Sequence, residues 1–214
     1  MEVCKHHMEE PMKIYPPGKY NGKITAEQFL FYEIRIASKY YLAGTSVEDA
    51  IKEIRENNLF QYPTERLVAR MVRSCYIRMD ALADGQLRQE LAEAPVQIAK
   101  QVNLYAMMRY NRIVWDFMVN VIGEKFRNQD FDFSRKDLNV FFSGLQEQSD
   151  DVAGWSESTV NKIKQVLTKL LVEVEILDTV RAVRLNPLFI SEELEQGIRR
   201  NHDFEALAAF NCIP

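Results

Sequence analysis

The chain has 214 residues, of which 47% are hydrophobic and 27% are charged, with only eight glycines and seven prolines. A chain of this length can bury about 70% of its unfolded surface and needs no disulfide or metal to fold, and its composition favours helices over a turn-rich β fold. The formal net charge of −4 excludes a protein that is basic all over. A local basic face is still allowed, because phosphate attracts cations within about 8 Å at physiological salt.

In chain order, the predicted elements are helices separated by polar breaks. Residues 1–23 form an irregular arm, interrupted by Pro11 and by Pro16-Pro17-Gly18. Thr25 with Gln28 resembles a capping box and begins the first helix. Further helices are expected at residues 46–57, 64–82, 86–94, 95–127 with a break near Asn111, 134–146 and 156–176, and short closing helices follow Ser191 and Asp203.

The order of these elements predicts an all-α protein with two helix-turn-helix-like units. A β-like segment at residues 180–185 would add a short β-hairpin, and so a wing, to the C-terminal unit. Residues 95–127 carry many large apolar side chains and are expected to form the buried centre. We expect an arm at 1–23, an N-terminal lobe at 24–129 and a C-terminal lobe at 130–214, which can pack as one domain.

The helix from residue 156 has two contrasting faces when each residue advances 100°. One face is apolar, and the opposite face carries hydroxyl, amide and ammonium groups without a carboxylate. Lysine grips phosphate, and asparagine and glutamine pair with adenine in the major groove. The alternative is a solvated helix face. We call this face the polar stripe; it consists of Ser158, Asn161, Lys162, Gln165, Thr168 and Lys169. The predicted wing adds Arg181 and Arg184, which do not share a strand face, so that one of them would reach an adjacent phosphate.

The helix from residue 64 repeats this arrangement. Arg66, Arg70 and Arg73, here called the arginine stripe, lie opposite an apolar arc. Three neighbouring guanidinium groups repel one another unless an anion lies among them, and phosphate matches the guanidinium fork. The alternative is pairing with carboxylates of neighbouring helices, such as those of Glu53, Glu56 or Asp80. Arg78 lies on the apolar arc, which the helical pattern does not explain.

Catalytic and metal-binding patterns are largely missing. Cys4, Cys75 and Cys212 follow no spacing typical of zinc, and an odd number of cysteines predicts free thiols in a reducing cytosol. Asp130, Asp132 and Lys136 faintly resemble a nuclease cluster, but a capped helix start explains them better. No phosphate-binding loop or nucleophile elbow occurs. We expect no catalytic residue, no metal, no cofactor and no small-molecule substrate.

Targeting segments are not expected either. Residues 1–21 lack the apolar core of a signal peptide. No apolar run approaches the ~20 residues that a membrane helix needs. We therefore expect a cytoplasmic protein without a membrane partner.

Several short motifs occur in an order that resembles the BrxA family of bacteriophage exclusion (BREX) systems, from about Ile24 to Gln196. They are Phe31-Tyr32-Glu33, Asn57-Asn58-Leu59-Phe60, the arginine-rich helix, and Trp155-Ser156 with Thr159 opening a helix that ends in an Ile-Leu pair.

The resemblance implies an all-α, non-enzymatic protein encoded beside a DNA methyltransferase, an ATPase and other phage-defence proteins. It also implies double-stranded DNA binding by helix-turn-helix units, with the helices at Thr64 and Ser156 contacting DNA. Family members have been likened to an RNA-binding antitermination factor as well. Two alternatives therefore stay open: an adaptor that joins other BREX proteins, and an RNA-binding module.

Overall fold

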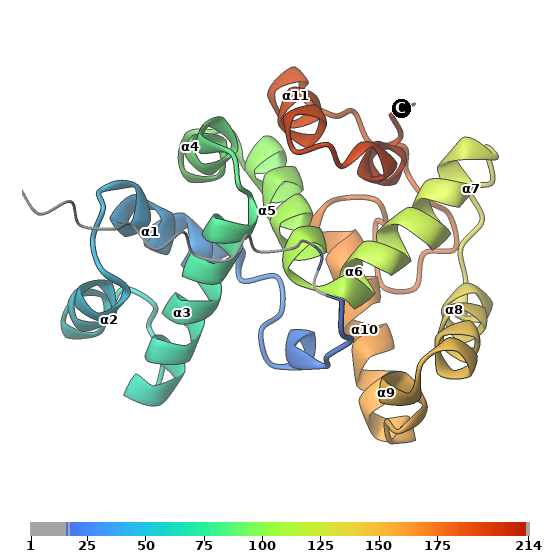
Figure 1. Ribbon diagram of the computed structural model, residues 1–214, viewed down its shortest axis with the longest axis horizontal. Helices are drawn as coiled ribbons and strands as arrows, with labels where there is room; N and C mark the ends of the chain where they lie inside the picture. Colours follow the sequence, from blue (N-terminus) through green and yellow to red (C-terminus); the bar gives the residue numbers. More distant parts are fainter. Residues whose placement is uncertain (1–15, 17, 213–214) are drawn as a thin grey trace, which may run out of the picture.

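The computed structural model describes residue 16 and residues 18–212. Within these residues the chain forms eleven α-helices, two 3₁₀ segments and one π-helical stretch, with no β-sheet (Figure 1). The all-α prediction is therefore confirmed. The elements are η1 Lys23–Thr25, α1 Phe31–Leu42, α2 Val47–Glu56, α3 Glu65–Ala81, α4 Gly85–Glu93, α5 Val96–Tyr110, α6 Arg112–Phe117, η2 Met118–Gly123, α7 Glu124–Arg127, α8 Arg135–Gln148, α9 Asp150–Ala153, α10 Glu157–Glu173, α11 Glu192–Arg200 and η3 Phe204–Phe210.

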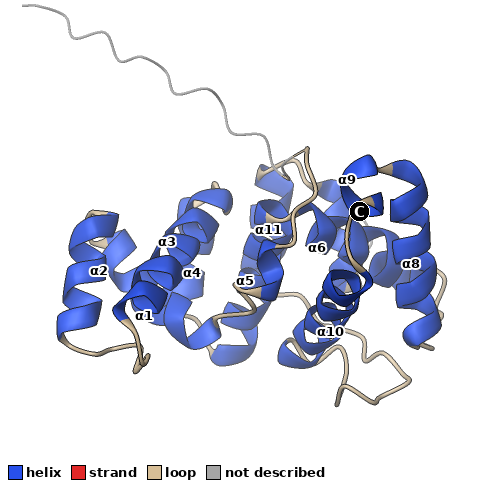
Figure 2. Ribbon diagram, turned by 90° about the horizontal axis from the view of Figure 1, so that it is seen from below, coloured by secondary structure: helices blue, strands red, loops and turns tan. Residues whose placement is uncertain are grey.

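Helix α5 is the centre of the molecule. Every side chain from residue 101 to residue 109 is buried, as expected for a helix packed on all sides. Figure 2 shows α5 between the group α1–α4 and the group α6, α8 and α10. The side chain of Asn111 accepts hydrogen bonds from the backbone N–H groups of Ile113, at 3.0 Å, and Val114, at 3.4 Å. It thereby caps α6 and produces the predicted break.

The closing helices return to the N-terminal half. Segment η3 packs on η2, where a side chain added at Gly123 would lie 3.1 Å from the Cβ atom of Ala208. Helix α11 packs on α4 so closely that a Cβ atom at Gly197 would lie 2.5 Å from the side chain of Leu87. One continuous cluster of buried side chains therefore includes residues from before and after position 130.

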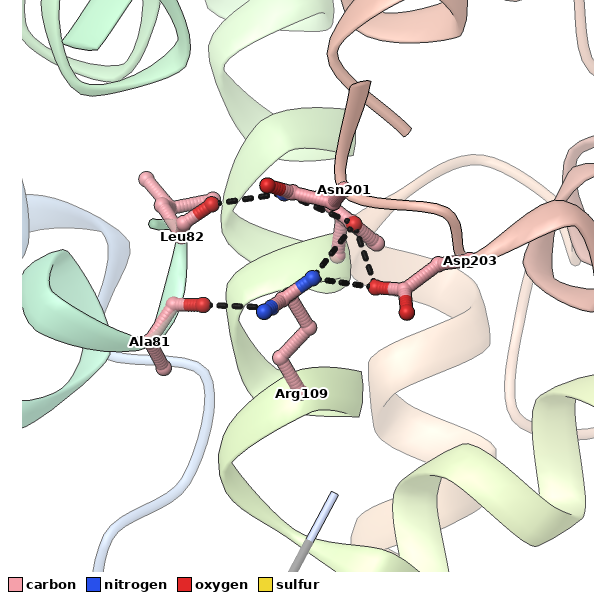
Figure 3. Close-up of polar contacts among 6 residues, drawn as sticks. Ala81, Leu82, Arg109, Asn201 and Asp203 are labelled. Atoms are coloured by element: carbon pink, nitrogen blue, oxygen red, sulfur yellow. Dashed lines mark hydrogen bonds and ion pairs between the residues drawn. The ribbon is translucent and has the colours of Figure 1, made fainter. Parts of the chain in front are cut away.

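A buried polar network fixes this return (Figure 3). The Arg109 guanidinium of α5 donates to the backbone carbonyl of Ala81, at 2.5 Å, and forms an ion pair with Asp203. The Tyr105 hydroxyl donates to Asp203 at 2.6 Å, and burial raises its pKa. Asn201 donates to the Leu82 carbonyl at 2.7 Å. Asp203 was expected to cap a helix, but its side chain makes no cap bond to η3.

Residues 26–30 do not form the predicted helix start. The Thr25 hydroxyl donates to the Gly22 carbonyl, and α1 begins only at Phe31. The reason is Arg78 of α3, whose fully buried guanidinium donates to the carbonyls of residues 27, 28 and 29 at 2.5, 2.6 and 2.9 Å. Asn103 donates to the last of these at 2.7 Å. These carbonyls are thus satisfied by side chains, which explains an arginine on an apolar arc.

The predicted hairpin at residues 180–185 does not form. This segment instead makes one isolated antiparallel bridge, between Asp132 and Arg184. The N–H of Phe133 donates to the Val183 carbonyl at 2.9 Å, and the N–H of Leu185 donates to the Phe131 carbonyl at 2.7 Å. The Val183 carbonyl and the Leu185 N–H thus pair with the segment before α8 instead of with a second strand of a local hairpin. No helix in the described part of the chain is long and apolar enough to cross a membrane.

Candidate nucleic-acid interface

The arginine stripe lies on the solvent side of α3. Arg66, Arg70 and Arg73 are all exposed, because the opposite face buries Val68, Met71, Cys75 and Met79. None of the three arginines forms an ion pair or hydrogen bond with a described residue, including the carboxylates considered as partners. The neighbouring pair is instead Arg55 of α2 with Glu65, at 3.1 Å. The stripe is therefore uncompensated by described acidic groups.

The polar stripe lies on the solvent side of α10. Ser156 caps this helix by accepting a hydrogen bond from the N–H of Thr159 at 3.2 Å, and the opposite face is buried. Thr168 is half-buried, and its hydroxyl donates to the Lys164 carbonyl of the same helix at 2.9 Å. Thr168 is therefore less accessible to a ligand than the rest of the stripe. The exposed members of the stripe are Ser158, Asn161, Lys162, Gln165 and Lys169.

The two arginines of the expected wing lie in the loop after α10. Both Arg181 and Arg184 are exposed. Arg181 follows Thr179 in a turn, where the Thr179 side chain accepts from its N–H at 3.3 Å. The Arg184 guanidinium lies 5.6 Å from the centre of the Phe131 ring, which orients it toward the start of α8. The arginines therefore project from a loop and not from a hairpin.

Residues 21–30 join the two stripes. Segment η1 packs on α10, where a Cβ atom at Gly22 would lie 3.8 Å from the side chains of Thr159 and Ile163. The following residues are held by Arg78 of α3. Figure 1 shows α3 and α10 on either side of this segment. The segment thus connects two helices that are far apart in the sequence.

The stripes meet at a groove of about 890 Å³. Arg70 lines it from α3 and Lys169 lines it from α10, whereas the other members of the two stripes lie outside it. Its floor is formed by residues 28–33. Lys100 lines the same groove from α5 and was not among the predicted residues, because its apolar neighbours indicate a helix that is buried on all sides.

Of the acidic residues considered for a nuclease, Asp130 is engaged in structural contacts, and its carboxylate also accepts a hydrogen bond from the backbone N–H of Asp132 at 3.1 Å. The Lys125 ammonium contacts Asp130 at 2.8 Å and Asp137 at 3.0 Å. Partial burial would raise the pKa of Asp137, but hydrogen bonds from Lys125 and from the N–H of Ser134 lower it below its usual range. In residues 18–212 no three His, Cys, Asp or Glu side chains are grouped to hold a metal ion. Cys4, His6 and His7 lie outside the described residues.

Comparison with known proteins gives one consistent family. The BrxA family model matches residues 18–202. A protein of Bacillus cereus (strain H3081.97), named BREX protein BrxA, is 30% identical over 158 residues, which are 74% of this chain and 78% of that protein. A second BREX protein BrxA, from Paramagnetospirillum magneticum (strain ATCC 700264 / AMB-1), is 23% identical and covers 86% of this chain and 92% of its own length.

A solved structure has the same fold. The crystal structure of an uncharacterized protein from Magnetospirillum magneticum matches with a TM-score of 0.74 at 21% identity, covering 89% of this chain and 97% of that protein. The family match extends over most of the chain and includes both stripe-bearing helices. The chain therefore belongs to the BrxA family.

Proposed function

We propose that this protein is a non-enzymatic component of a BREX phage-defence system that binds double-stranded DNA in the cytoplasm. The BREX assignment rests on the relatives named BREX protein BrxA. DNA binding rests on one observation: the exposed stripes on α3 and α10 flank one groove, which Arg70 and Lys169 line, and their cations have no acidic partner among the described residues.

The proposed contacts divide into two kinds. Arg66, Arg70, Arg73, Lys162 and Lys169 would bind phosphates, with Arg181 and Arg184 reaching the adjacent backbone. Asn161 and Gln165 present amides that fit base edges, and Ser158 fits a phosphate or a base. A single backbone bridge joins the segment before α8 to the segment after α10, so α8 to α10 resemble a helix-turn-helix unit without the predicted hairpin. Helix α10 would then be the recognition helix.

The test is a salt titration of binding to a fluorescent duplex. Each phosphate contact contributes about 0.9 to the slope of log K against log salt concentration. The change of Arg66, Arg70 and Arg73 together to Ala should reduce the slope by about 2.7. A matched control changes Arg55, Arg127 and Arg199 to Ala, which removes the same charge from arginines that already pair with Glu65, Glu124 and Glu195.

The control should leave most of the slope intact, because its arginines are compensated on the surface. Equal losses in both triple variants would mean that only net charge matters, and absence of salt-dependent binding would exclude the proposal. An RNA duplex of the same length serves as competitor. Stronger competition by RNA than by DNA would favour the RNA-binding alternative.

A second candidate is an adaptor that joins other BREX proteins. It is favoured by Val140 of α8 and Val183 of the loop, which are 64% and 69% exposed and line one groove with Phe133 and Phe141. Exposed apolar groups clustered in a groove are typical of a protein-binding surface. Retention of BREX proteins that survives Arg70→Glu and Lys162→Glu but is lost in Val140→Asp would favour this function.

A further inference from the structure

The groove between α3 and α10 combines aromatic rings with cations. The rings come from Phe31 and Tyr32 at the start of α1 and from Tyr62 before α3. Tyr32 is 54% exposed, so one ring is available to a ligand without any rearrangement. The Lys100 ammonium lies 5.8 Å from the centre of the Phe31 ring. Bases of an unpaired strand are held by this combination, since every base has a face that stacks on an aromatic ring.

The acidic side chains of the groove are already engaged. Glu33 accepts a hydrogen bond from the Tyr62 hydroxyl at 2.5 Å, and Glu173 pairs with Lys100 at 3.4 Å. Arg70 and Lys169, on opposite walls, have no such partner among the described residues. The hydroxyl of Tyr62 leaves Glu33 negatively charged, so the groove keeps a net positive charge of one, with the free cations on its two walls. Phosphates of one strand would pass at Arg70 and Lys169.

The size of the groove suits a short stretch of one strand. Its volume of about 890 Å³ lies within the range that encloses a small-molecule ligand. That volume accommodates a few nucleotides of one strand. The floor is also preformed, because Arg78 fixes the backbone of residues 27–29 through three hydrogen bonds. A preformed floor reduces the ordering cost of binding.

We propose that this groove binds a single strand of nucleic acid, with a base stacked on Tyr32 and phosphates held by Arg70 and Lys169. The inference rests on the proposed function, because both cations belong to the stripes that would bind duplex DNA. It adds a second binding mode: a strand that leaves a duplex end or an opened region would enter the groove while the outer stripe residues hold the paired part.

The experiment measures fluorescence anisotropy of the full chain with a ten-nucleotide oligo-dT, an oligo-U of equal length and a duplex. Base–aromatic stacking contributes about 1–3 kcal/mol per base, so Tyr32→Ala should weaken single-strand binding by roughly 5- to 150-fold. Tyr32→Phe keeps the ring and should bind like the parent. Phe189→Ala removes an even more exposed ring, 89% exposed, outside this groove and serves as the control.

A second pair of variants uses charge and does not depend on Tyr32. Arg70→Ala should weaken single-strand binding at least threefold more than Arg66→Ala, because only Arg70 lines the groove although both arginines are exposed on the same helix. For the duplex, the two variants should lose similar affinity. Single-strand binding that follows this pattern supports the groove. Whether oligo-dT, oligo-U or both bind then shows whether the groove accepts DNA, RNA or either.

Failure of the groove is distinguishable from failure of duplex binding. If the duplex binds with the expected salt slope but the single strand does not bind, or binds equally well to Tyr32→Ala and the parent, the groove proposal is overturned alone. An equal effect of Arg66→Ala and Arg70→Ala on the single strand overturns it as well. Absence of binding to all three probes overturns both proposals.

Discussion

Arg78 should be one of the residues on which the stability of the fold depends most. Its guanidinium is fully buried, and burial lowers its pKa. In Arg78→Met the apolar volume is largely kept, but the carbonyls of residues 27 and 28 lose their donor, whereas that of residue 29 keeps Asn103. Each orphaned carbonyl costs about 1–3 kcal/mol, which gives a loss of about 4 kcal/mol in the free energy of unfolding.

This loss corresponds to a fall in Tm of about 8–16 °C for a protein of this size. Thermal unfolding followed by circular dichroism measures it, with Arg66→Met as the matched control. Arg66 lies on the same helix but is exposed, so that change should stay within about 0.5 kcal/mol. A loss below about 1 kcal/mol in Arg78→Met would refute the reasoning, since residues 26–30 would then be held by something other than the guanidinium.

Three further predictions concern the packing of the closing helices. Gly197→Ala should lower the free energy of unfolding by about 1–3 kcal/mol because the added methyl overlaps a buried leucine of α4. Gly144→Ala, in open space on α8, should raise the free energy of unfolding by about 0.5–1 kcal/mol. Equal midpoints of urea unfolding for the two variants would contradict the close contact between Gly197 and Leu87. Asp203→Ala removes the carboxylate partner of the buried Arg109 and should cost about 3–5 kcal/mol in the same assay; a cost under 1 kcal/mol would show that the pair is dispensable. Partial burial raises the pKa of Asp84, but hydrogen bonds from α11 and from the start of α4 outweigh it and leave the pKa lowered. The ionised Asp84 carboxylate therefore stabilises the fold fully above the unfolded pKa of about 3.9, and this stabilisation is lost as pH falls through the lower folded pKa. Asp84→Asn should lose less stability than the parent between pH 5 and pH 2. An equal loss in both proteins would exclude a stabilising role of the carboxylate.

Local signals in the sequence predicted the helices well. Ser46, Ser134, Ser156 and Ser191 each cap the helix that they were expected to begin. This works because a capping hydroxyl acts on N–H groups two or three residues away and depends little on the rest of the fold. The faces of α3 and α10 were predictable for a similar reason, since helical periodicity alone separates the buried side from the exposed side.

Signals that depend on distant partners misled the prediction. Thr25 and Gln28 have the spacing of a capping box, but the carbonyls that follow are taken by a guanidinium about fifty residues away. Residues 180–185 have the composition of a strand, but their backbone partners lie before α8. The division into an arm and two lobes stays a prediction, and so does the role of every residue in the two stripes.

The relation between the two stripes is the part of the site that no single helix could reveal. Each stripe faces solvent because the opposite side of its helix is buried, and part of that burial is supplied by the same segment, residues 21–30, which packs on α10 and is held by α3. A helical wheel finds the faces but not their mutual placement. The placement depends on one buried arginine that keeps the segment out of a helix. The cations of the groove thus lie where they do because of a residue that no ligand would touch, and variants of Arg78 should weaken ligand binding even though its side chain is buried beneath the groove floor.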